Sequence, residues 1–346
     1  MTHQIALLPG DGVGPEVVAE ARGCLDALAL DIEWSELDWG SDHWLEHGTM
    51  MPADAIERLQ RFDAILMGAV GRPGIPDHLT LWGLLLTIRQ RLDLWANVRP
   101  VRLLEGVPCV LAGRGPADVD MLFVRENSEG EYSGVGGRAH QGFPGEVGIE
   151  TSVFTRAGVE RVVEHAFKLA GGRRGLVTSA TKSNASRFGY VLWDEVAAEV
   201  ASRYPDIRYE HVLVDALAAR MVVRPDTLDV VVASNLFGDI LTDIGAAVQG
   251  GMGMAASANL CPGGTVPGLF EPVHGSAPDI AGQGIANPCG AVWSAVLMLD
   301  HLGEQAAAAR LLTALEDVCR EGPRTRDLGG TATTAEVGTA LRARLA

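Results

Sequence analysis

The sequence predicts an α/β fold built around a largely parallel sheet, and two observations support this prediction. Apolar runs of strand length alternate with longer amphipathic segments, and 42 glycines and 17 prolines among 346 residues supply turns between them. This alternation is typical of βαβ units, in which a helix carries the chain back to the start of the next parallel strand. The length exceeds that of a usual single domain, so we expect two domains that pack against each other.

The first series of alternating elements ends near residue 70. In order, the pattern predicts a strand at 4–9, a helix at 15–30, a strand at 32–39, a helix at 52–62 and a strand at 63–70. A second series comprises helices at 155–170 and 190–205 and strands at 175–182, 209–215 and 228–235. Between the two series, residues 122–154 alternate like a hairpin with glycine turns, which predicts a β-rich excursion. Residues 290–320 have a helical pattern.

Composition excludes several classes of function. The formal net charge of −16 opposes non-specific binding to nucleic acid. No apolar stretch approaches the roughly 18 residues of a membrane span, and the start MTHQIALL lacks a basic region and a cleavage site. We therefore expect a cytoplasmic protein without a membrane partner. The five cysteines are odd in number and never form C-x-x-C, which argues against a disulfide framework and a zinc knuckle.

A small anionic substrate would need a local basic pocket, and one stretch of the chain can supply it. Lysine occurs only as Lys168 and Lys182, so a general bias toward arginine explains most basic surface positions. Because arginine cannot replace an amine that must lose its proton, each lysine is a candidate for proton transfer. Six arginines lie close together in the sequence: Arg89, Arg91, Arg99, Arg102, Arg114 and Arg125.

Three motif-like stretches do not complete their motifs. The loop PGDGVG places Pro15 where G-x-G-x-x-G needs its last glycine, so it predicts a strand-to-helix turn beside a ligand rather than a dinucleotide fingerprint. HWLEH at 43–47 matches a zinc-protease pattern, but Gly48 follows at once, which favours a surface turn of helix. GLVTSATKS has Thr181 where a phosphate-binding loop has glycine, and no G-x-S-x-G is present.

The sharpest local signal is NLFGDILTDIG, in which Asp239 and Asp243 share one face of a predicted helix. Two like charges at this spacing destabilise a helix unless something neutralises them. Carboxylate oxygens suit Mg²⁺ or Mn²⁺, and Asp215 at the end of a predicted strand could add a third ligand. The spacing alone is equally compatible with a solvated acidic stripe.

Five motifs together carry a resemblance that covers essentially the whole chain. GDGVGPE, RENSEGEYSG, TSATKSN, SNLFGDILTD and LFEPVHGSAPDIAGQGIANP resemble, in this order, the metal-dependent β-decarboxylating dehydrogenases, which include isocitrate, isopropylmalate, tartrate and D-malate dehydrogenases. The resemblance implies a two-domain α/β fold distinct from the Rossmann fold, with a β arm at a dimer interface. Residues 1–99 with 253–346 would form the large domain on the cofactor side, and 100–252 the small domain with the dimerisation arm and helices.

The resemblance also implies roles for individual residues. Arg89, Arg99 and Arg125 match the arginines that hold the substrate carboxylates. Lys182 matches the base that takes the hydroxyl proton, and Tyr132 matches the acid that protonates the enol carbon. The metal ligands would be Asp239 and Asp243 with Asp215, and both Asp215 and Lys182 would come from the neighbouring subunit of a homodimer, which can pair further into a tetramer. The implied cations are Mg²⁺ or Mn²⁺, with K⁺ as an additional candidate.

The cofactor implied is NAD. In the family the loop HGSAPDIAGQGIAN holds the adenosine, and an acidic residue suits the two ribose hydroxyls while repelling the extra phosphate of NADP. Asp279 and Ile280 stand where NADP-dependent relatives carry a lysine and a tyrosine. The remaining adenosine residues would be His274, Gly275, Ser276, Ala277 and Asn287.

The substrate implied is a small (R)-2-hydroxy dicarboxylate, with D-malate first and tartrate next. The determinant is the predicted helix that begins DHLTLWGLLLTIRQ, which most resembles the tartrate and D-malate subgroup. Trp82 replaces a glutamate that is typical of isopropylmalate enzymes, while Leu85 and Leu86 remain as in those enzymes. Leu84 and Thr87 are less polar than in the subgroup, so 3-isopropylmalate or another 3-alkylmalate stays open. A noncatalytic nucleotide-binding subunit is a further alternative, against which the retained Lys182 and Tyr132 argue.

Overall fold

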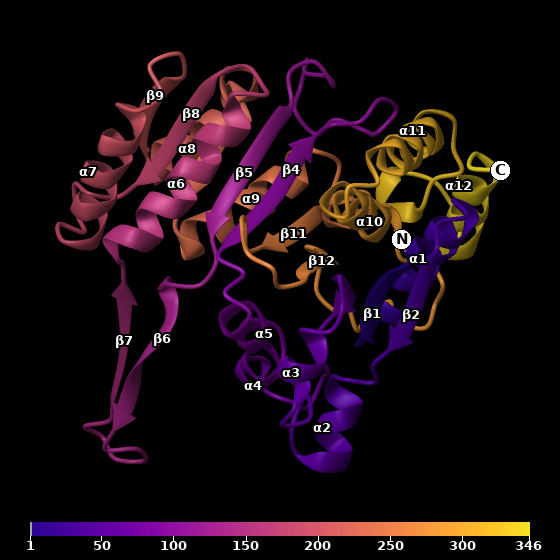
Figure 1. Cartoon of the computed structure of the whole chain (residues 1–346), viewed down its shortest axis with the longest axis horizontal. Coiled ribbons are helices and arrows are strands. Elements are labelled where there is room, and N and C mark those ends of the chain that lie inside the picture. The colour runs from indigo at the N-terminus through magenta and orange to yellow at the C-terminus, as the bar shows by residue number, and fades with distance from the viewer. Residues whose placement is uncertain (1) are drawn as a thin grey trace.

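A single mixed sheet runs through the molecule (Figure 1). The computed structural model describes residues 2–346. Within that range the sheet has ten strands, in the spatial order β2 (Ile32–Glu36), β1 (His3–Gly10), β3 (Ala64–Ala69), β12 (Gly268–Pro272), β11 (Ala256–Leu260), β4 (Ala96–Arg102), β5 (Asp120–Glu126), β10 (Val230–Ala233), β8 (Leu176–Thr181) and β9 (Arg208–Leu213).

The pairing of the central strands places distant parts of the sequence side by side. β1, β2 and β3 are mutually parallel neighbours, as are β5, β10, β8 and β9, while β11 and β4 run antiparallel to the strands beside them. In this register Asn97 of β4 lies between Arg125 of β5 and Asn259 of β11. The predicted alternation of strands and helices is confirmed, but the sheet is mixed because two antiparallel strands join its parallel halves.

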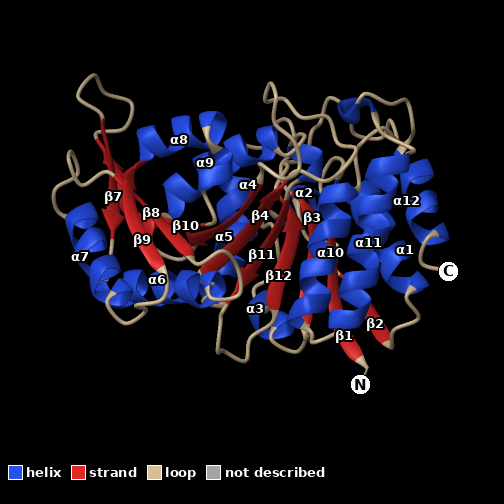
Figure 2. Ribbon diagram, turned by 90° about the horizontal axis from the view of Figure 1, so that it is seen from above, coloured by secondary structure: helices blue, strands red, loops and turns tan. Residues whose placement is uncertain are grey.

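Helices cover both faces of the sheet (Figure 2). Beside β5, β10 and β8, helices α6 (Arg156–Ala170) and α7 (Gly189–Ala201) cover one face, and α8 (Val214–Val223) and α9 (Asn235–Val248) cover the other. At the other end, α1 (Gly14–Ala27), α10 (Cys289–His301), α11 (Gln305–Glu321) and α12 (Thr334–Ala343) pack together, which brings the first helix of the chain against the last.

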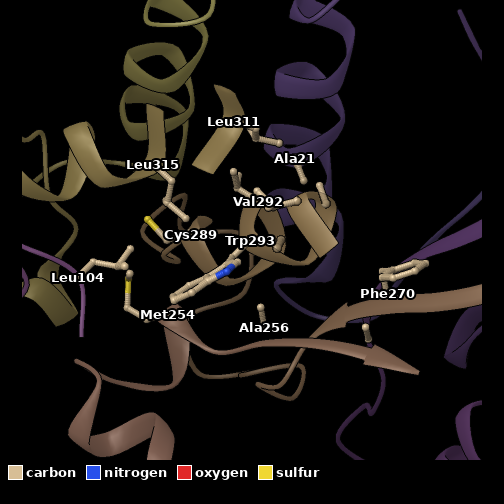
Figure 3. Close-up of a cluster of buried hydrophobic side chains, with 14 of the residues drawn as sticks. Ala21, Leu104, Met254, Ala256, Phe270, Cys289, Val292, Trp293, Leu311 and Leu315 are labelled. Carbon is tan, nitrogen blue, oxygen red and sulfur yellow. The ribbon is translucent and has the colours of Figure 1, made fainter. Parts of the chain in front are cut away.

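The largest hydrophobic core is centred on α10. Trp293 lies among Met254, Cys289 and Leu315, with Phe270 of β12 further along the same cluster (Figure 3). These residues come from the last third of the chain, and Ala21 of α1 packs against them from the first third. Among residues 2–346, no helix is both long enough and apolar enough to cross a lipid bilayer.

The predicted β-rich excursion forms a hairpin that stands apart from the main sheet. Strands β6 (Gly130–Ala139) and β7 (Val147–Val153) pair antiparallel and project away from the body in Figure 1. Val135, Val147 and Ile149 are exposed on it. A role of this hairpin as a dimerisation arm stays a prediction. The division into domains at residues 99 and 253 also stays a prediction. At the first boundary, β4 pairs both with β11 of the expected large domain and with β5 of the expected small domain.

Several predicted boundaries were wrong. The segment expected to form one helix before Arg99 is split into α4 (Asp77–Gly83) and α5 (Leu85–Arg91), because Leu84 leaves the helical conformation (φ −133°, ψ −81°) and buries its side chain in the core. The helix at 52–62 is reduced to α3 (Ala55–Leu59), and α2 (Ser41–His47) precedes it. β2, α7 and β9 end at Glu36, Ala201 and Leu213, before the predicted ends at 39, 205 and 215. Asp215 therefore lies in the first turn of α8 and not at a strand end.

Candidate active site

The glycines of the opening loop allow backbone segments to approach each other. A Cβ atom on Gly10 would lie 2.0 Å from the carbonyl oxygen of Ala69, and one on Gly12 would lie 2.0 Å from that of Ser276. Both glycines have positive φ, 72° and 60°, which also favours glycine. The backbone N–H of Val13 donates to the Ser276 carbonyl at 2.9 Å. The loop is therefore a strand-to-helix turn, as predicted. It also packs against the backbone of Ala69 and Ser276.

The carboxylate of Asp11 binds two further segments to the opening loop. Its oxygens accept hydrogen bonds from the backbone N–H of Gly71 at 2.7 Å and from the N–H and hydroxyl of Ser41 at 2.9 and 2.7 Å. Asp11 thus holds the segment after β3 and the start of α2, while Val13 holds the segment after β12, and the segments after β3 and β12 line the cavities described below.

Three arginines from three different elements converge on one cavity. Arg89 lies on α5, Arg99 on β4 and Arg125 on β5, and their side chains are only 5%, 6% and 2% exposed. Arg89 donates from Nη2 to Oε1 of Glu271 on β12 at 2.7 Å. Its buried Nε finds no hydrogen-bond partner within residues 2–346.

Arg99 and Arg125 share a carboxylate on α9. Arg99 lies 3.5 Å from Oδ1 of Asp239 and donates to Oδ1 of Asn97 at 2.6 Å. Arg125 pairs with the same oxygen of Asp239 and donates from Nε and Nη2 to Oδ1 of Asn235 at 3.0 and 2.8 Å. A Cβ on Gly238 would lie 2.6 Å from Cβ of Arg125, so this glycine allows the arginine to lie against the helix.

The charges of this cluster do not balance. Three guanidinium groups face two carboxylates, those of Asp239 and Glu271. Burial, followed by the charge of Arg125, lowers the pKa of Arg99, and the attraction of Asp239 and Glu271 does not offset this. For Asp239, burial raises the pKa, but the attraction of Arg125 and Arg99 outweighs it, so the group stays ionised. A small dianion would supply the missing negative charge.

Tyr132 points into the same cluster from the base of the hairpin. Its hydroxyl donates to Oδ2 of Asp239 at 3.3 Å, and its ring centroid lies 5.7 Å from the guanidinium carbon of Arg125. Burial and then the charge of Asp239 raise the pKa of the phenol, so it keeps its proton at neutral pH. Gln90 of α5 donates to the Tyr132 carbonyl at 3.2 Å and holds its backbone in place.

The cavity has a volume of about 420 Å³ and one apolar wall. The arginines, Tyr132 and Asp239 form its polar side, and His274 and Gly275 reach it from the loop after β12. The predicted specificity residues line it, together with three that sequence reasoning missed, His78, Leu81 and Glu271. Glu271 lies inside the quoted motif LFEPVHG, but only the pairing of β12 with β11 brings it to Arg89. The apolar wall consists of Leu81, Trp82, Leu85 and Leu86.

The acidic pair on α9 is only partly engaged. Asp243 lies one helical turn after Asp239, and burial followed by the charge of Asp239 raises its pKa. Within residues 2–346, no three Asp, Glu, His or Cys side chains come close enough together to hold a metal ion, and this includes the HWLEH segment. A single chain therefore brings together two of the three predicted ligands.

Lys182 and Asp215 lie together, but away from this cavity. Nζ of Lys182 is 3.0 Å from Oδ2 of Asp215, and neither residue lines the cavity that contains Tyr132 and Asp239. Asp215 is 67% exposed at its side chain, and Phe188 and Ile240 are exposed apolar side chains on α7's leading loop and on α9. The sequence motifs predicted both residues, but not that they pair with each other.

A second cavity of about 380 Å³ lies beside the opening loop. Of the predicted adenosine residues, His274, Ala277, Ile280 and Asn287 line it, and His274 also lines the first cavity, which links the two. Ser276 does not line it, although its carbonyl accepts from the backbone N–H of Val13, and Asp279 is exposed outside the lining. Arg326 and Asp327 also line the cavity and were not predicted from the sequence. Asp327 accepts a hydrogen bond from Nδ2 of Asn287 at 2.9 Å.

Comparison with known proteins shows which family the chain resembles. A family model described as Isocitrate/isopropylmalate dehydrogenase matches residues 4–341. A probable tartrate dehydrogenase/decarboxylase of Agrobacterium vitis is 53% identical over 345 residues, which cover 98% of this chain and 96% of that protein. A D-malate dehydrogenase (decarboxylating) of Escherichia coli is 50% identical over 352 residues, with 98% of each chain covered.

Comparison with solved structures gives the same family. The crystal structure of isocitrate dehydrogenase from Methylococcus capsulatus superimposes with a TM-score of 0.91 at 36% identity, and the match covers 99% of both chains. The family predicted from the five motifs is thereby confirmed, together with its α/β fold. The chain belongs to the isocitrate/isopropylmalate dehydrogenase family.

Proposed function

We propose that this protein is an NAD-dependent enzyme that oxidatively decarboxylates a small (R)-2-hydroxy dicarboxylate, with D-malate as the first candidate and tartrate as the second. One observation carries the proposal: three buried guanidinium groups, compensated by only two carboxylates, face a cavity that also contains a protonated phenol. Relatives at about half identity are named for oxidative decarboxylation of tartrate and of D-malate.

The arginines would bind the two substrate carboxylates. Arg89, Arg99 and Arg125 come from separate elements, so their forks can grip a dianion from different directions. Because all three are buried, their attraction to the substrate is screened little by water. The apolar residues around Trp82 would close the other side and exclude water from the reacting atoms.

Two residues would move protons. Lys182 would accept the proton of the substrate hydroxyl as hydride leaves the same carbon, and Tyr132 would deliver a proton to the carbon from which CO₂ has departed. The raised pKa of Tyr132 suits an acid, because the phenol is protonated at working pH. Bound NAD would accept the hydride.

The donor set on α9 fits a hard divalent cation. Asp239 and Asp243 are neighbouring carboxylates that repel each other in the absence of a cation, and Mg²⁺ and Mn²⁺ prefer such oxygen ligands. When bound, the cation would stabilise negative charge that develops on substrate oxygens. K⁺ belongs in the assay as a further cation.

A homodimer would complete the site. Lys182 and Asp215 do not line the cavity of their own chain, and their side chains are 29% and 67% exposed, so a second copy can reach them. In this arrangement Asp215 of one copy would exchange its Lys182 partner for the cation held by Asp239 and Asp243 of the other. The hairpin with its exposed Val135 and Ile149 would contribute to the same interface.

NAD is favoured over NADP because the acidic residue Asp279 directly precedes Ile280, which lines the second cavity. An acidic side chain suits ribose hydroxyls and repels a phosphate. The cavity itself is mainly apolar, with Val13, Ile280 and Ile285 on its surface, which suits an adenine ring. Replacement of Asp279 by lysine is expected to shift the ratio of kcat/KM values toward NADP, and an unchanged ratio would place the adenosine elsewhere.

A 3-alkylmalate, including 3-isopropylmalate, is the second candidate substrate. The observation that favours it is the apolar wall of four side chains opposite the arginines, which could bury an alkyl group at the third carbon. D-malate and tartrate carry no such group. The two candidates therefore differ in how they would use Leu85 and Leu86.

Steady-state NADH formation with a substrate panel tests the proposal. The purified protein would be assayed with D-malate, tartrate, 3-isopropylmalate and isocitrate, each with Mn²⁺ and K⁺, and the highest kcat/KM is expected for D-malate. A preference for 3-isopropylmalate would favour the second candidate. No turnover with any of the four, but binding of NAD by calorimetry, would favour a noncatalytic nucleotide-binding subunit and overturn the proposal.

Subunit complementation tests the shared site. Lys182→Ala and Asp239→Asn homodimers should each be inactive, because both sites of each lack an essential group. After unfolding and refolding as a mixture, about half of the dimers would be mixed, and one of their two sites would be intact, so activity should return. Two inactive variants whose refolded mixture stays inactive would contradict the shared site.

A further inference from the structure

A chain of buried amide groups connects two of the substrate arginines. Nε of Arg99 donates to Oδ1 of Asn97 at 2.6 Å, and Nδ2 of Asn97 donates to Oδ1 of Asn259 at 2.9 Å. Nδ2 of Asn259 then donates to Oε1 of Glu271 at 3.0 Å, and the same oxygen accepts from Nη2 of Arg89 at 2.7 Å. All five residues are at most 5% exposed.

The direction of every hydrogen bond in this chain is fixed by its ends. Arg99 can only donate, so the amide oxygen of Asn97 must face it and the NH₂ group must face Asn259. Asn259 must then accept with its oxygen, which leaves its NH₂ group to donate to the acceptor-only carboxylate of Glu271. No amide can be flipped without two donors or two acceptors facing each other. Such an oriented chain between a cation and an anion is cooperative.

The strand register explains why the chain can form. Asn97 of β4 and Asn259 of β11 are directly opposite each other in the antiparallel pair, so their side chains lie on one face of the sheet. Asparagine is unfavourable in strand interiors, and both residues are fully buried between apolar layers. A buried amide in a strand needs partners, and here those partners lead to the substrate arginines on either side.

We propose that Asn97, Asn259 and Glu271 are positioning residues that hold Arg89 and Arg99 in one fixed relative geometry, so that the two arginines recognise the carboxylates of a dicarboxylate as a pair. This inference rests on the proposed function only in that the arginines bind substrate. Four further contacts support the amides without joining the arginines. Asn97 also donates to Oγ of Ser257 at 2.7 Å and to the Ala258 carbonyl at 3.4 Å, Asn259 donates to the Leu269 carbonyl at 3.0 Å, and Asn127 donates to Oδ1 of Asn259 at 3.0 Å.

The substitution Asn259→Asp tests the orientation of the chain. A carboxyl group has the same shape, but it can donate to Glu271 only while it is protonated. Burial and the Glu271 carboxylate on β12 should raise the pKa of the introduced group, while Arg99 on β4, acting through Asn97, and Arg89 on α5 oppose this. At low pH the chain is intact, and as pH rises the introduced charge removes the donor and repels Glu271.

The measurement is KM for the best dicarboxylate against pH, for the wild type and three variants. For Asn259→Asp we expect a KM close to that of the wild type at about pH 6 and about tenfold higher at about pH 8.5, with a smaller change in kcat. Asn259→Leu should have a raised KM at both values. Ser257→Ala is the matched control, because it removes a hydrogen bond of Asn97 but no link between the arginines, and its KM should stay within about threefold of the wild type.

Two results would overturn the proposal. One is a KM profile of Asn259→Asp that runs parallel to the wild type across this pH range, and the other is an Asn259→Leu variant with wild-type KM. Either would mean that the arginines do not depend on the amide chain for their geometry. Circular dichroism and thermal unfolding of each variant would establish that the KM values belong to folded protein.

A readout without substrate separates this inference from the proposed function. The Nε–H of Arg99 is buried and hydrogen-bonded, so its exchange with water, followed by NMR of arginine side chains, should be slow in the wild type. In Asn259→Leu we expect exchange about tenfold faster, because Asn97 loses its anchor, whereas Ser257→Ala should match the wild type. Unchanged exchange in Asn259→Leu would refute the chain even in an active enzyme, and faster exchange would support it even if no tested substrate is turned over.

Discussion

The two ends of strand β5 carry arginine clusters that differ in charge balance. At its start, Arg173 donates to Oδ1 of Asp229 at 2.8 Å and to Oδ1 of Asp120 at 3.0 Å, and Arg174 joins from 3.6 Å, so two guanidinium groups meet two carboxylates. At its carboxyl end, Arg125 belongs to a group of three guanidinium groups with two carboxylates. In the first cluster guanidinium groups and ion-paired carboxylates are equal in number, whereas the second has one more guanidinium group than ion-paired carboxylates, with Asp243 acting on Arg99 and Arg125 only from the next helical turn.

The pKa values of the two clusters express this difference. Burial disfavours the charge of Arg173, but hydrogen bonds to Asp120 and Asp229 outweigh it, so its pKa is raised. Burial also disfavours the charge of Arg99, and there the neighbouring Arg125 adds to the effect, so the pKa is lowered. We expect the first cluster to stabilise the fold and the second to be held in place by the fold for the proposed ligand. The proposed ligand-binding end is also the carboxyl end of the strand, as is usual in α/β sheets.

Arg125→Met should separate the roles of the two clusters most clearly. This change should lower kcat/KM by about 10³-fold, since a charge-assisted fork to the substrate is lost. The free energy of unfolding should fall by only about 1 kcal/mol, because Oδ1 of Asn235 loses its two donors from Arg125 while Asp239 is 37% exposed and keeps Arg99 at 3.5 Å. Steady-state kinetics and urea unfolding of the same preparation check both parts. Arg125→Lys is the matched variant, which keeps the charge without the fork and should recover only part of the activity. A variant that unfolds in lower urea and keeps wild-type kcat/KM would mean that Arg125 serves the fold.

Arg173→Met should have the opposite profile. It leaves the carboxylate of Asp229, which is 2% exposed, without its best partner, and we expect the free energy of unfolding to fall by about 3 kcal/mol. The kcat/KM of the folded fraction should equal that of the wild type, because this cluster lies at the far end of the strand. Urea unfolding with kinetics below the transition provides the check. If stability is unchanged and activity is lost, the assignment of the two clusters is reversed.

Tyr132→Phe removes the phenol hydroxyl from the cluster of three arginines and leaves the arginines in place. We expect kcat to fall about 10²-fold with little change in KM, because a proton donor is lost while the arginines remain. The raised pKa means that Tyr132 keeps its proton through the working range, so any loss of kcat that the wild type has below about pH 10 should also be present in the variant. An alkaline limb that disappears in Tyr132→Phe would mean that the phenol loses its proton within the working range.

Local patterns in the sequence predicted some of the elements that carry the site, but not the strands β4, β11 and β12 or the break between α4 and α5. The spacing of Asp239 and Asp243 predicted their shared helix face, and α9 has the expected helical conformation. The alternation of strands and helices was also correct, because burial on both faces makes parallel strands continuous apolar runs. The arginines came from the family motifs, since nothing in their spacing shows that three separate elements bring them together.

The rest depended on contacts between distant segments. Glu271 is an unremarkable acid in sequence, and its role follows from the pairing of β12 with β11. The asparagines of the amide chain did carry a signal, since buried strands seldom contain them, but only the register identifies their partners. The break at Leu84 could not be predicted from periodicity, because tertiary packing of that side chain overrides local helix preference.

His165 of α6 is a buried base that, unlike the arginines, can be neutral. Its ring is packed edge-on against Trp95, and its buried Nε2 has no hydrogen-bond partner within residues 2–346. Burial, with a smaller effect of Lys168, lowers its pKa from 6.5 to about 4. The residue therefore escapes an unbalanced charge by staying neutral, which an arginine cannot do.

The smallest expected effect is the pH dependence that this neutral histidine gives to stability. The unfolded chain binds a proton to His165 below pH 6.5 and the folded chain does not, so its contribution to stability is present above pH 6.5 and is lost progressively as pH falls toward 4. Between about pH 7 and about pH 5 this residue should remove about 2 kcal/mol from the free energy of unfolding of the wild type and nothing from that of His165→Leu. Urea unfolding of both proteins across this range isolates the residue, because all other titrating groups are shared. A difference between them that does not change with pH would mean that a partner compensates His165 in the folded protein.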